Sequence, residues 1–226
     1  MPGPSRSNNN VASVSKRPRY QRTSTKTKKV TKYRPRALPD PVDFGRYSLP
    51  LRAKNVMRYS STQELTIDVS GNALASFRAN GLYDPEVAVG GHQPLYFDQL
   101  SEIYNHWHVV KSRFKATLVL VTGIGGSCQV TQFIDDDSTP TTGAIAIRER
   151  PGAYSRQYTS ATTDTPGYTN FNAQAAFGGN IIDNDDLKGT ALADPAEQQV
   201  FFVYLSQGTP TNVFQLNVEI EYEVVW

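Results

Sequence analysis

The clearest hydrophobic pattern in the chain lies at its C-terminal end, in residues 213–226, VFQLNVEIEYEVVW. Apolar side chains occupy every second position from Phe214 to Trp226, and most positions between them hold Gln, Asn or Glu. A strict period of two is typical of a strand with one buried and one solvent-exposed face. These residues therefore predict a long strand whose exposed face is acidic, carrying Glu219, Glu221 and Glu223.

A second long strand is predicted at 108–121, HVVKSRFKATLVLV. Lys111, Arg113 and Lys115 share one parity of this segment, so one face of the strand is basic. Shorter strands are predicted at 65–69, 73–77, 128–134, 143–149 and 199–206. The Gly71-Asn72 turn predicts that 65–69 and 73–77 pair as a hairpin.

Helical spacing is limited to short segments. Apolar residues recur at helical spacing in 97–107, which predicts one short helix, and 173–177 and 195–199 predict single helical turns. The stretch 150–186 has no strong periodic pattern and predicts a long loop, and such loops often contact a partner. Together these elements predict an all-β fold: a single eight-stranded jelly-roll sandwich with long loops, one short helix and a disordered basic N-terminal arm.

Charge divides the chain into two parts. Residues 1–36 contain eleven of the 23 Lys and Arg residues and no Asp or Glu, whereas 37–226 holds 12 basic and 21 acidic residues. The first part has almost no large aliphatic side chains, so we expect it to be disordered when free. The predicted domains are therefore a basic arm, 1–36, and a jelly-roll body, 37–226. The cations of the arm are Arg6, Lys16, Arg17, Arg19, Arg22, Lys26, Lys28, Lys29, Lys32, Arg34 and Arg36.

Eleven cations on a flexible tether favour a polyanion as partner. Each contact with a phosphate releases a condensed counterion, which drives binding without reading base sequence. Tyr20 and Tyr33 lie among these charges and could stack on unpaired bases. The arm therefore predicts nucleic-acid binding, with a solubility tail as the alternative. Lys16, Arg17 and Arg19 also match a short nuclear-import signal, a common pattern in basic tails.

Enzymatic and metal-binding patterns are weak. The single cysteine, Cys128, excludes an internal disulfide framework and fits a reducing compartment. His106 and His108 could share a strand face and bind a metal, but no carboxylate partner is evident. The glycine loop 123–127 lacks the Gly-Lys-Ser/Thr ending of a phosphate-binding loop. The acidic clusters 135–137 and 183–186 lack the EF-hand spacing of a calcium site. We expect no enzyme activity, cofactor or metal site, no secretory signal and no membrane span.

Residues 80–121 carry a longer motif: Gly91-His92-Gln93-Pro94, then Phe97-Asp98-Gln99, Tyr104-Asn105-His106 and Lys111-Ser112-Arg113. This segment resembles the capsid proteins of circovirus-like viruses, which have circular single-stranded DNA and encode a replication initiator. The resemblance implies a jelly roll repeated as 60 copies in an icosahedral shell, with the arm directed inward to package the genome. It also implies host nuclear import receptors and a cell attachment factor as partners, and locations in the virion and the host nucleus.

Several alternatives stay open from the residues alone. Lys111, Arg113 and Lys115 either extend the nucleic-acid surface or form an ordinary solvent face paired with Glu219, Glu221 or Glu223. The capsid jelly roll of a small RNA virus fits the same charge pattern, because phosphate contacts carry no information about the sugar. A cellular β-rich nucleic-acid-binding protein and a carbohydrate-binding or enzymatic jelly roll are the remaining alternatives.

Overall fold

A computed structural model describes residues 50–88, 91–123, 125–140, 143–159 and 167–226. The predicted basic arm, with its import signal, lies outside these residues. The body of the chain, from Leu49 to Trp226, forms its own compact unit.

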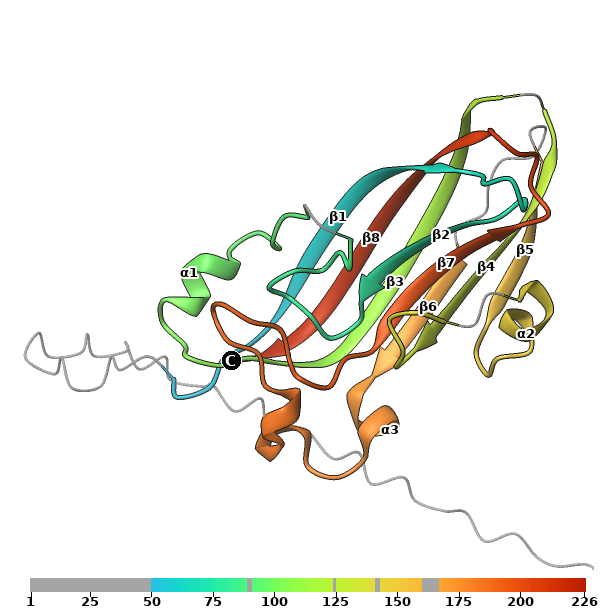
Figure 1. The fold of residues 1–226 in the computed structure, drawn as a ribbon. Coiled ribbons are helices and arrows are strands. Elements are labelled where there is room, and N and C mark those ends of the chain that lie inside the picture. The colour runs from blue at the N-terminus through green and yellow to red at the C-terminus, as the bar shows by residue number, and fades with distance from the viewer. Residues whose placement is uncertain (1–49, 89–90, 124, 141–142, 160–166) are drawn as a thin grey trace, which may run out of the picture. The chain divides into compact units, whose positions relative to one another are not determined.

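Two antiparallel four-stranded sheets make up the body (Figure 1). One sheet has the order β1-β8-β3-β6 and the other the order β2-β7-β4-β5. The strands are β1 (Lys54–Thr66), β2 (Ala73–Arg78), β3 (His108–Thr122), β4 (Ser127–Asp135), β5 (Tyr154–Thr159), β6 (Gly167–Asn172), β7 (Val200–Ser206) and β8 (Val213–Val225). The chain alternates between the sheets except at β4 and β5, which are neighbours in one sheet. This strand order is that of a jelly roll, so the predicted all-β, eight-stranded sandwich is confirmed.

The C-terminal strand β8 is central to its sheet. It pairs along its full length with β1, from Val213 opposite Thr66 to Val225 opposite Lys54, and on its other side with β3. Its even-numbered side chains are buried, and its odd-numbered side chains lie on the outer face, as the period of two predicts. The strand predictions at 213–226 and 108–121 are therefore confirmed.

The space between the sheets is filled by aromatic and aliphatic side chains. Phe114 on β3 stacks on Phe201 of β7 with ring centroids 5.0 Å apart, and Phe77 of β2 lies 5.6 Å from Phe114. All three are fully buried, so these contacts join the two sheets directly. Such ring pairs add about 0.5–1.5 kcal/mol beyond the burial of their area.

The predicted hairpin is wrong, and so are the bounds of its first strand. The strand predicted at 65–69 shares only Leu65 and Thr66 with the end of β1, whereas the strand predicted at 73–77 lies within β2. β1 pairs with β8 and β2 pairs with β7, so the turn at 67–72 carries the chain from one sheet to the other. Inside this turn the Asp68 carboxylate accepts hydrogen bonds from the backbone N–H groups of Ser70 and Asn72. A turn does lie at Gly71-Asn72, as predicted. However, β1 has thirteen residues and pairs along its full length with β8, which also has thirteen, rather than with the six-residue β2.

The strand predicted at 143–149 is a helix, α2 (Ala144–Arg148). The alternation Ala-Ile-Ala-Ile fits a strand, but only Ile147 is buried, while Ile145 is 65% exposed. A strand here would also lack a free edge on β4, which already pairs with β5 and β7. One turn of helix buries the single isoleucine without needing a β partner.

The predicted long loop at 150–186 is wrong as well, because it contains β5 and β6. In β6 the buried positions are Gly167, Thr169 and Phe171, so a single large apolar residue marks the inner face. The same stretch holds α3 (Ala173–Phe177), which confirms the turn predicted at 173–177, and the 3-10 turns η2 (Ile181–Asp183) and η3 (Asp185–Leu187). The turn predicted at 195–199 is not helical.

The helix predicted at 97–107 is shorter than expected and spans α1 (Phe97–Ser101). Trp107 does not continue it, because its backbone exchanges hydrogen bonds with Gly189 at 3.1 and 2.9 Å. The described residues thus contain three short α-helices where one was expected. Among them, no helix has the length and apolar character that crossing a bilayer requires.

Candidate nucleic-acid interface

The outer face of the β1-β8-β3-β6 sheet carries a ladder of alternating charge. Glu219, Glu221 and Glu223 project from β8 in the middle of it. On one side β3 places Lys115 opposite Glu219, Arg113 opposite Glu221 and Lys111 opposite Glu223. On the other side β1 contributes Lys54 and Arg58. We call this set of eight residues the charged sheet face.

Ion pairs connect the three strands. The Lys115 Nζ lies 3.1 Å from the Glu219 carboxylate, the Arg58 guanidinium 2.6 Å from that of Glu221, and the Lys54 Nζ 3.4 Å from that of Glu223. The alternative in which the basic face of β3 pairs with the β8 glutamates is therefore seen at Lys115. Side chains of these pairs are 30–79% exposed, and exposed pairs contribute only about 0–1 kcal/mol each.

The β6 side of this sheet adds an aromatic ring and two amides. The Arg113 guanidinium lies over the Tyr168 ring, 4.1 Å from its centroid, and the register places Asn170 opposite Arg113 and Asn172 opposite Lys111. A hollow of about 460 Å³ lies beside Lys111, Arg113 and the two asparagines. A smaller hollow of about 150 Å³ lies beside Arg113, Lys115 and Tyr168.

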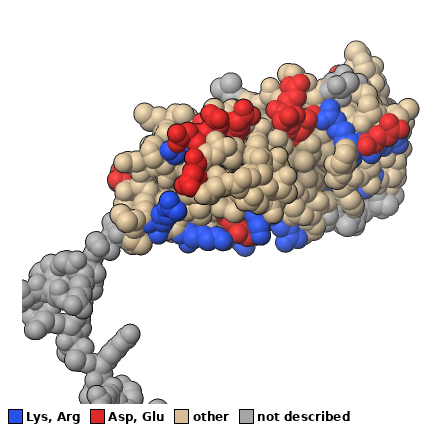
Figure 2. All heavy atoms as spheres, turned by 90° about the horizontal axis from the view of Figure 1, so that it is seen from below, with Lys and Arg blue, Asp and Glu red and all other residues tan. Residues whose placement is uncertain are grey.

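Cations are not spread evenly over the body. In the view of Figure 2, Lys and Arg side chains follow the lower border of the described part, with an acidic side chain among them. Most of the visible Asp and Glu side chains lie on the opposite side. The charged sheet face itself has five cations against three glutamates, although the body as a whole is acidic.

The sequence analysis found part of this face. Lys111, Arg113 and Lys115 are brought together as predicted, whereas the eleven cations of the arm lie outside the described residues. Lys54 and Arg58 were missed, although they alternate with the buried Met57 and Tyr59 and so carried a readable period-two signal. Tyr168 was missed because it lies in the stretch that was interpreted as a loop.

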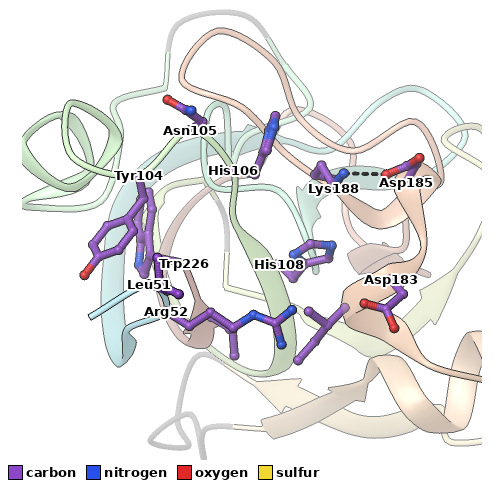
Figure 3. A pocket seen from close by; sticks show the side chains of 12 residues that line it. Leu51, Arg52, Tyr104, Asn105, His106, His108, Asp183, Asp185, Lys188 and Trp226 are labelled. Atoms are coloured by element: carbon purple, nitrogen blue, oxygen red, sulfur yellow. Dashed lines mark hydrogen bonds and ion pairs between the residues drawn. The ribbon is translucent and has the colours of Figure 1, made fainter. Parts of the chain in front are cut away.

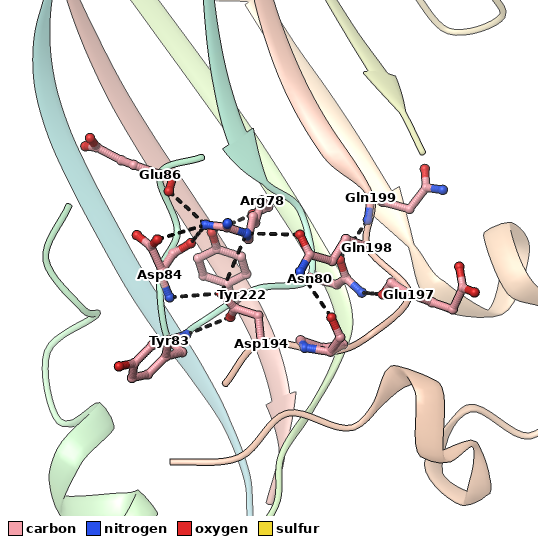
Figure 4. A network of polar contacts seen from close by, with 11 residues as sticks. Arg78, Asn80, Tyr83, Asp84, Glu86, Asp194, Glu197, Gln198, Gln199 and Tyr222 are labelled. Atoms are coloured by element: carbon pink, nitrogen blue, oxygen red, sulfur yellow. Dashed lines mark hydrogen bonds and ion pairs between the residues drawn. The ribbon is translucent and has the colours of Figure 1, made fainter. Parts of the chain in front are cut away.

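A second polar cluster lies at the end of β2 and is mostly buried (Figure 4). The Arg78 guanidinium donates to the Gln198 side chain at 3.0 Å and to the Glu86 carbonyl at 2.8 Å, and it pairs with Asp84 at 3.1 Å and Asp194 at 3.6 Å. The Asp194 carboxylate accepts from the backbone N–H groups of Tyr83 and Asp84. Its side chain is 7% exposed, and this burial raises the pKa of Asp194 to about 6.

This cluster fixes the first part of the motif at 80–121 in place. The Asn80 side chain donates to the Glu197 carbonyl and accepts from the backbone N–H of Gln199, at 2.8 and 2.9 Å. Tyr222 in β8 donates to the Arg78 carbonyl at 2.8 Å. These contacts satisfy buried polar groups, and they tie Asn80 to the segment before β7 and the end of β2 to β8.

The other candidate sites from the sequence have local roles. Asp135 pairs with Arg150, and Asp185 pairs with Lys188. The glycine segment 123–127 connects β3 to β4 in the opposite sheet, and Cys128 is buried. Within the described ranges, no group of three or more His, Cys, Asp and Glu side chains could hold a metal ion.

No protein-family model and no curated protein sequence matches this chain. Solved structures do: the chain is similar to a structure titled Desmodium yellow mottle tymovirus, with 15% identity, a TM-score of 0.38 and coverage of 85% of this chain and 95% of that one. It is also similar to a virus-like particle of the giant freshwater prawn Macrobrachium rosenbergii nodavirus, with 14% identity, a TM-score of 0.43 and coverage of 77% and 93%. A third is the decameric BFDV capsid protein, with 7% identity, a TM-score of 0.41 and coverage of 77% and 98%. Since these TM-scores are below 0.5, the fold assignment stands on the strand order and register of this chain.

Proposed function

We propose that this chain is the capsid protein of a small icosahedral virus and that its basic arm packages a circular single-stranded DNA genome. The observation that carries the proposal is the segregation of charge: eleven cations without an acid in residues 1–36, followed by an acidic jelly-roll body. A single jelly roll repeated in 60 copies would form the shell, with the arms directed to the lumen. The circovirus-like motif at 80–121 favours DNA over RNA.

The charged sheet face supplies a second contact surface in this proposal. Its ion pairs are exposed and individually weak, so phosphate groups can compete with Glu219 for Lys115, and Lys111 and Arg113 lie on the same face of β3. The glutamates set a limit, because a strand lying over β8 meets like charge. We therefore assign the larger share of the affinity to the arm and a smaller, salt-sensitive share to this face.

Assembly requires contacts that overcome repulsion between like-charged bodies. Several large apolar side chains lie exposed outside the sheets, including Leu95 (72% exposed), Leu192 (81%) and Ile145 (65%). We propose that the loops and short helices carrying them form contacts between subunits, since burying such side chains favours association. The protein would then reside in the virion, and neutralisation of the arms by the genome would permit closure of the shell.

The import and attachment steps are part of the same proposal. Lys16, Arg17 and Arg19 would engage host import receptors and bring the protein to the nucleus during assembly. Once the arm holds nucleic acid, these charges are occupied, so import and packaging would be mutually exclusive. A cell attachment factor would bind the outer loops of the assembled particle.

The test has two parts. The purified full chain is examined by electron microscopy, and the nucleic acid protected inside particles from infected cells is digested with nucleases. The proposal predicts uniform closed particles whose protected nucleic acid, recovered from infected cells, is degraded by DNase and not by RNase. Protected RNA from infected cells would assign the protein to an RNA virus instead. A strict monomer at high protein concentration would reject the capsid role.

A further inference from the structure

A pocket of about 470 Å³ opens where the chain enters β1, where β3 begins and where β8 ends (Figure 3). The aromatic side chains of Tyr104 and Trp226 lie on one side of it, with ring centroids 6.3 Å apart. The 3-10 turns η2 and η3 close the other side. Its charged and titratable side chains are Arg52, His106, His108, Asp183, Asp185 and Lys188.

His108 is the buried polar group of this pocket. Its side chain lies between Arg52 and Lys188 in Figure 3, and the residue is only 5% exposed. The ring is hydrogen-bonded to the backbone of Asn184, while its Nε2 atom has no hydrogen-bond partner. Buried polar atoms without a partner are rare and costly, so an unpaired nitrogen beside a cavity marks a place where a ligand atom can bind.

Both cations and carboxylates line the pocket around His108. Burial lowers the pKa of His108, and the nearby Lys188, His106 and Arg52 lower it further. The two carboxylates of the pocket have other partners: Asp185 pairs with Lys188, and Asp183 accepts a hydrogen bond from the Asn180 amide at 2.5 Å. Arg52 and Lys188 therefore line the same pocket as an imidazole nitrogen that has no hydrogen-bond partner, and Lys188 is shared with Asp185.

We propose that this pocket binds a phosphate group between Arg52, Lys188 and the Nε2 atom of His108. Arg52 and Lys188 supply the charge, and protonated His108 donates its Nε2–H to a phosphate oxygen. Because the anion stabilises the imidazolium, binding takes up a proton and strengthens as the pH falls. The site does not depend on the arm, so this inference goes beyond the proposed function.

The phosphate can come from two sources, the backbone of a nucleic acid or a free phosphate. Both present the same oxygens to the pocket, but only a nucleic acid also offers a base that can stack on Tyr104 or Trp226. Comparing the dinucleotide d(TpT) with inorganic phosphate at one pH separates the two sources.

The experiment is a titration of the full chain with sodium sulfate at constant ionic strength, followed by NMR of the imidazole nitrogens. Sulfate is tetrahedral and keeps its charge between pH 5 and 8, so any pH dependence belongs to the protein. The chain has three histidines, His92, His106 and His108, and His92 does not line the pocket. We expect saturable shifts at His106 and His108 with none at His92, and tighter binding at pH 5.5 than at pH 7.5.

Variants locate the charges. Arg52→Gln and Lys188→Gln should each weaken sulfate binding about tenfold, the effect of losing one charge-assisted hydrogen bond. Asp185→Asn should strengthen it, because Lys188 is then released, and His108→Gln should abolish the pH dependence. Arg148→Gln, an exposed change on α2, is the matched control and should leave binding unchanged.

Three results would overturn the inference: no saturable shift at His108, equal shifts at all three histidines, or unchanged binding in the Arg52→Gln and Lys188→Gln variants. Arg52→Gln and Lys188→Gln leave His108 in place, so the test does not depend on whether the His108→Gln variant folds. Tighter binding of d(TpT) than of inorganic phosphate would assign the site to a nucleic acid, and the reverse order would assign it to free phosphate.

Discussion

The indole ring of Trp107 lies against the backbone of Gly189 so closely that a β-carbon on Gly189 would come within 2.1 Å of it. Trp107 is fully buried, and its Nε1–H donates to the Thr190 carbonyl at 3.0 Å. This contact joins the start of β3 to the segment after η3.

Gly189→Ala should therefore destabilise the body. The added methyl group overlaps a ring that is held by its own hydrogen bond, and overpacking of this kind costs about 1–3 kcal/mol or more. Chemical denaturation of the two proteins measures the difference. Gly143→Ala is the control, because its β-carbon would meet only the Ala146 side chain at 3.7 Å, and it should change the free energy of unfolding by less than about 0.5 kcal/mol.

Arg78→Ala should be strongly destabilising because it leaves the buried carboxylate of Asp194 without its cation. Breaking one side of a buried pair costs about 3–5 kcal/mol. Arg78→Lys should restore little of this loss, since an ammonium group cannot reproduce the several contacts of the guanidinium with Asp84, Gln198 and the Glu86 carbonyl.

Arg58→Ala is the comparison for that measurement. Arg58 also pairs with a carboxylate, Glu221, but its side chain is 79% exposed, so the loss should stay below about 1 kcal/mol. Equal effects of Arg58→Ala and Arg78→Ala on the free energy of unfolding would contradict the structural role assigned to the Arg78 cluster.

Asp194 should make the stability of the body depend on pH. Burial raises its folded-state pKa to about 6, above the unfolded value of 3.8, so the folded protein binds the proton more tightly. The contribution of this group is therefore complete below pH 3.8 and is lost as the pH rises through 6. A shift of about two pKa units corresponds to ~3 kcal/mol.

The measurement compares the wild-type protein with Asp194→Asn across pH 4 to 7. The stability of the wild type relative to the variant should fall as the pH rises, since only the wild type ionises at this position. A difference that stays constant over this range, or a pKa of Asp194 below 4 by carboxyl NMR, would rule out the raised pKa.

The charged sheet face should contribute to nucleic-acid binding in proportion to its cations. Replacing Lys111, Arg113 and Lys115 by Gln should reduce the slope of log K against log salt by about 2, at ~0.7 for each contact with a single strand. Replacing Glu219, Glu221 and Glu223 by Gln should have the opposite effect, because their ion-pair partners Lys115, Arg58 and Lys54 are then released. Binding of a labelled oligonucleotide at several salt concentrations measures both slopes, and identical slopes in all three proteins would remove this face from the interface.

The sequence predicted the parts of the fold in which one side chain in two is strongly apolar. β8 follows this rule along its length and β3 follows it in part, since Ser112 and Ala116 hold two of its buried positions. Both strands were predicted at the correct place in the chain. β6 was not found, because Gly167 and Thr169 occupy two of its three buried positions and carry little hydrophobic signal. α2 was predicted as a strand because Ala-Ile-Ala-Ile alternates, whereas in the structure only one of the two isoleucines, Ile147, is buried.

Pairing between strands was harder to predict than the strands themselves. The Gly71-Asn72 turn carries the signal of a hairpin, but whether β1 returns to β2 or pairs with β8 depends on a strand almost 150 residues away. The same limit applies to the sites: Lys111, Arg113 and Lys115 are visible in one strand, whereas Lys54, Arg58 and Tyr168 join them only through long-range register. The pocket at His108 unites four separate segments, and no local pattern identifies it.

Packaging by the basic arm can be tested by changing the charge of the arm at constant length. All eleven Lys and Arg residues of 1–36 are replaced by Gln, and binding to single-stranded DNA is measured between low and physiological salt against the unmodified chain. We expect a folded body, a salt slope near ~−10 for the unmodified chain when the eleven arm cations and the three cations of β3 all engage the strand, and a slope near ~−2 for the variant, at ~0.7 for each contact. Unchanged retention on single-stranded DNA at low salt in the variant would contradict it.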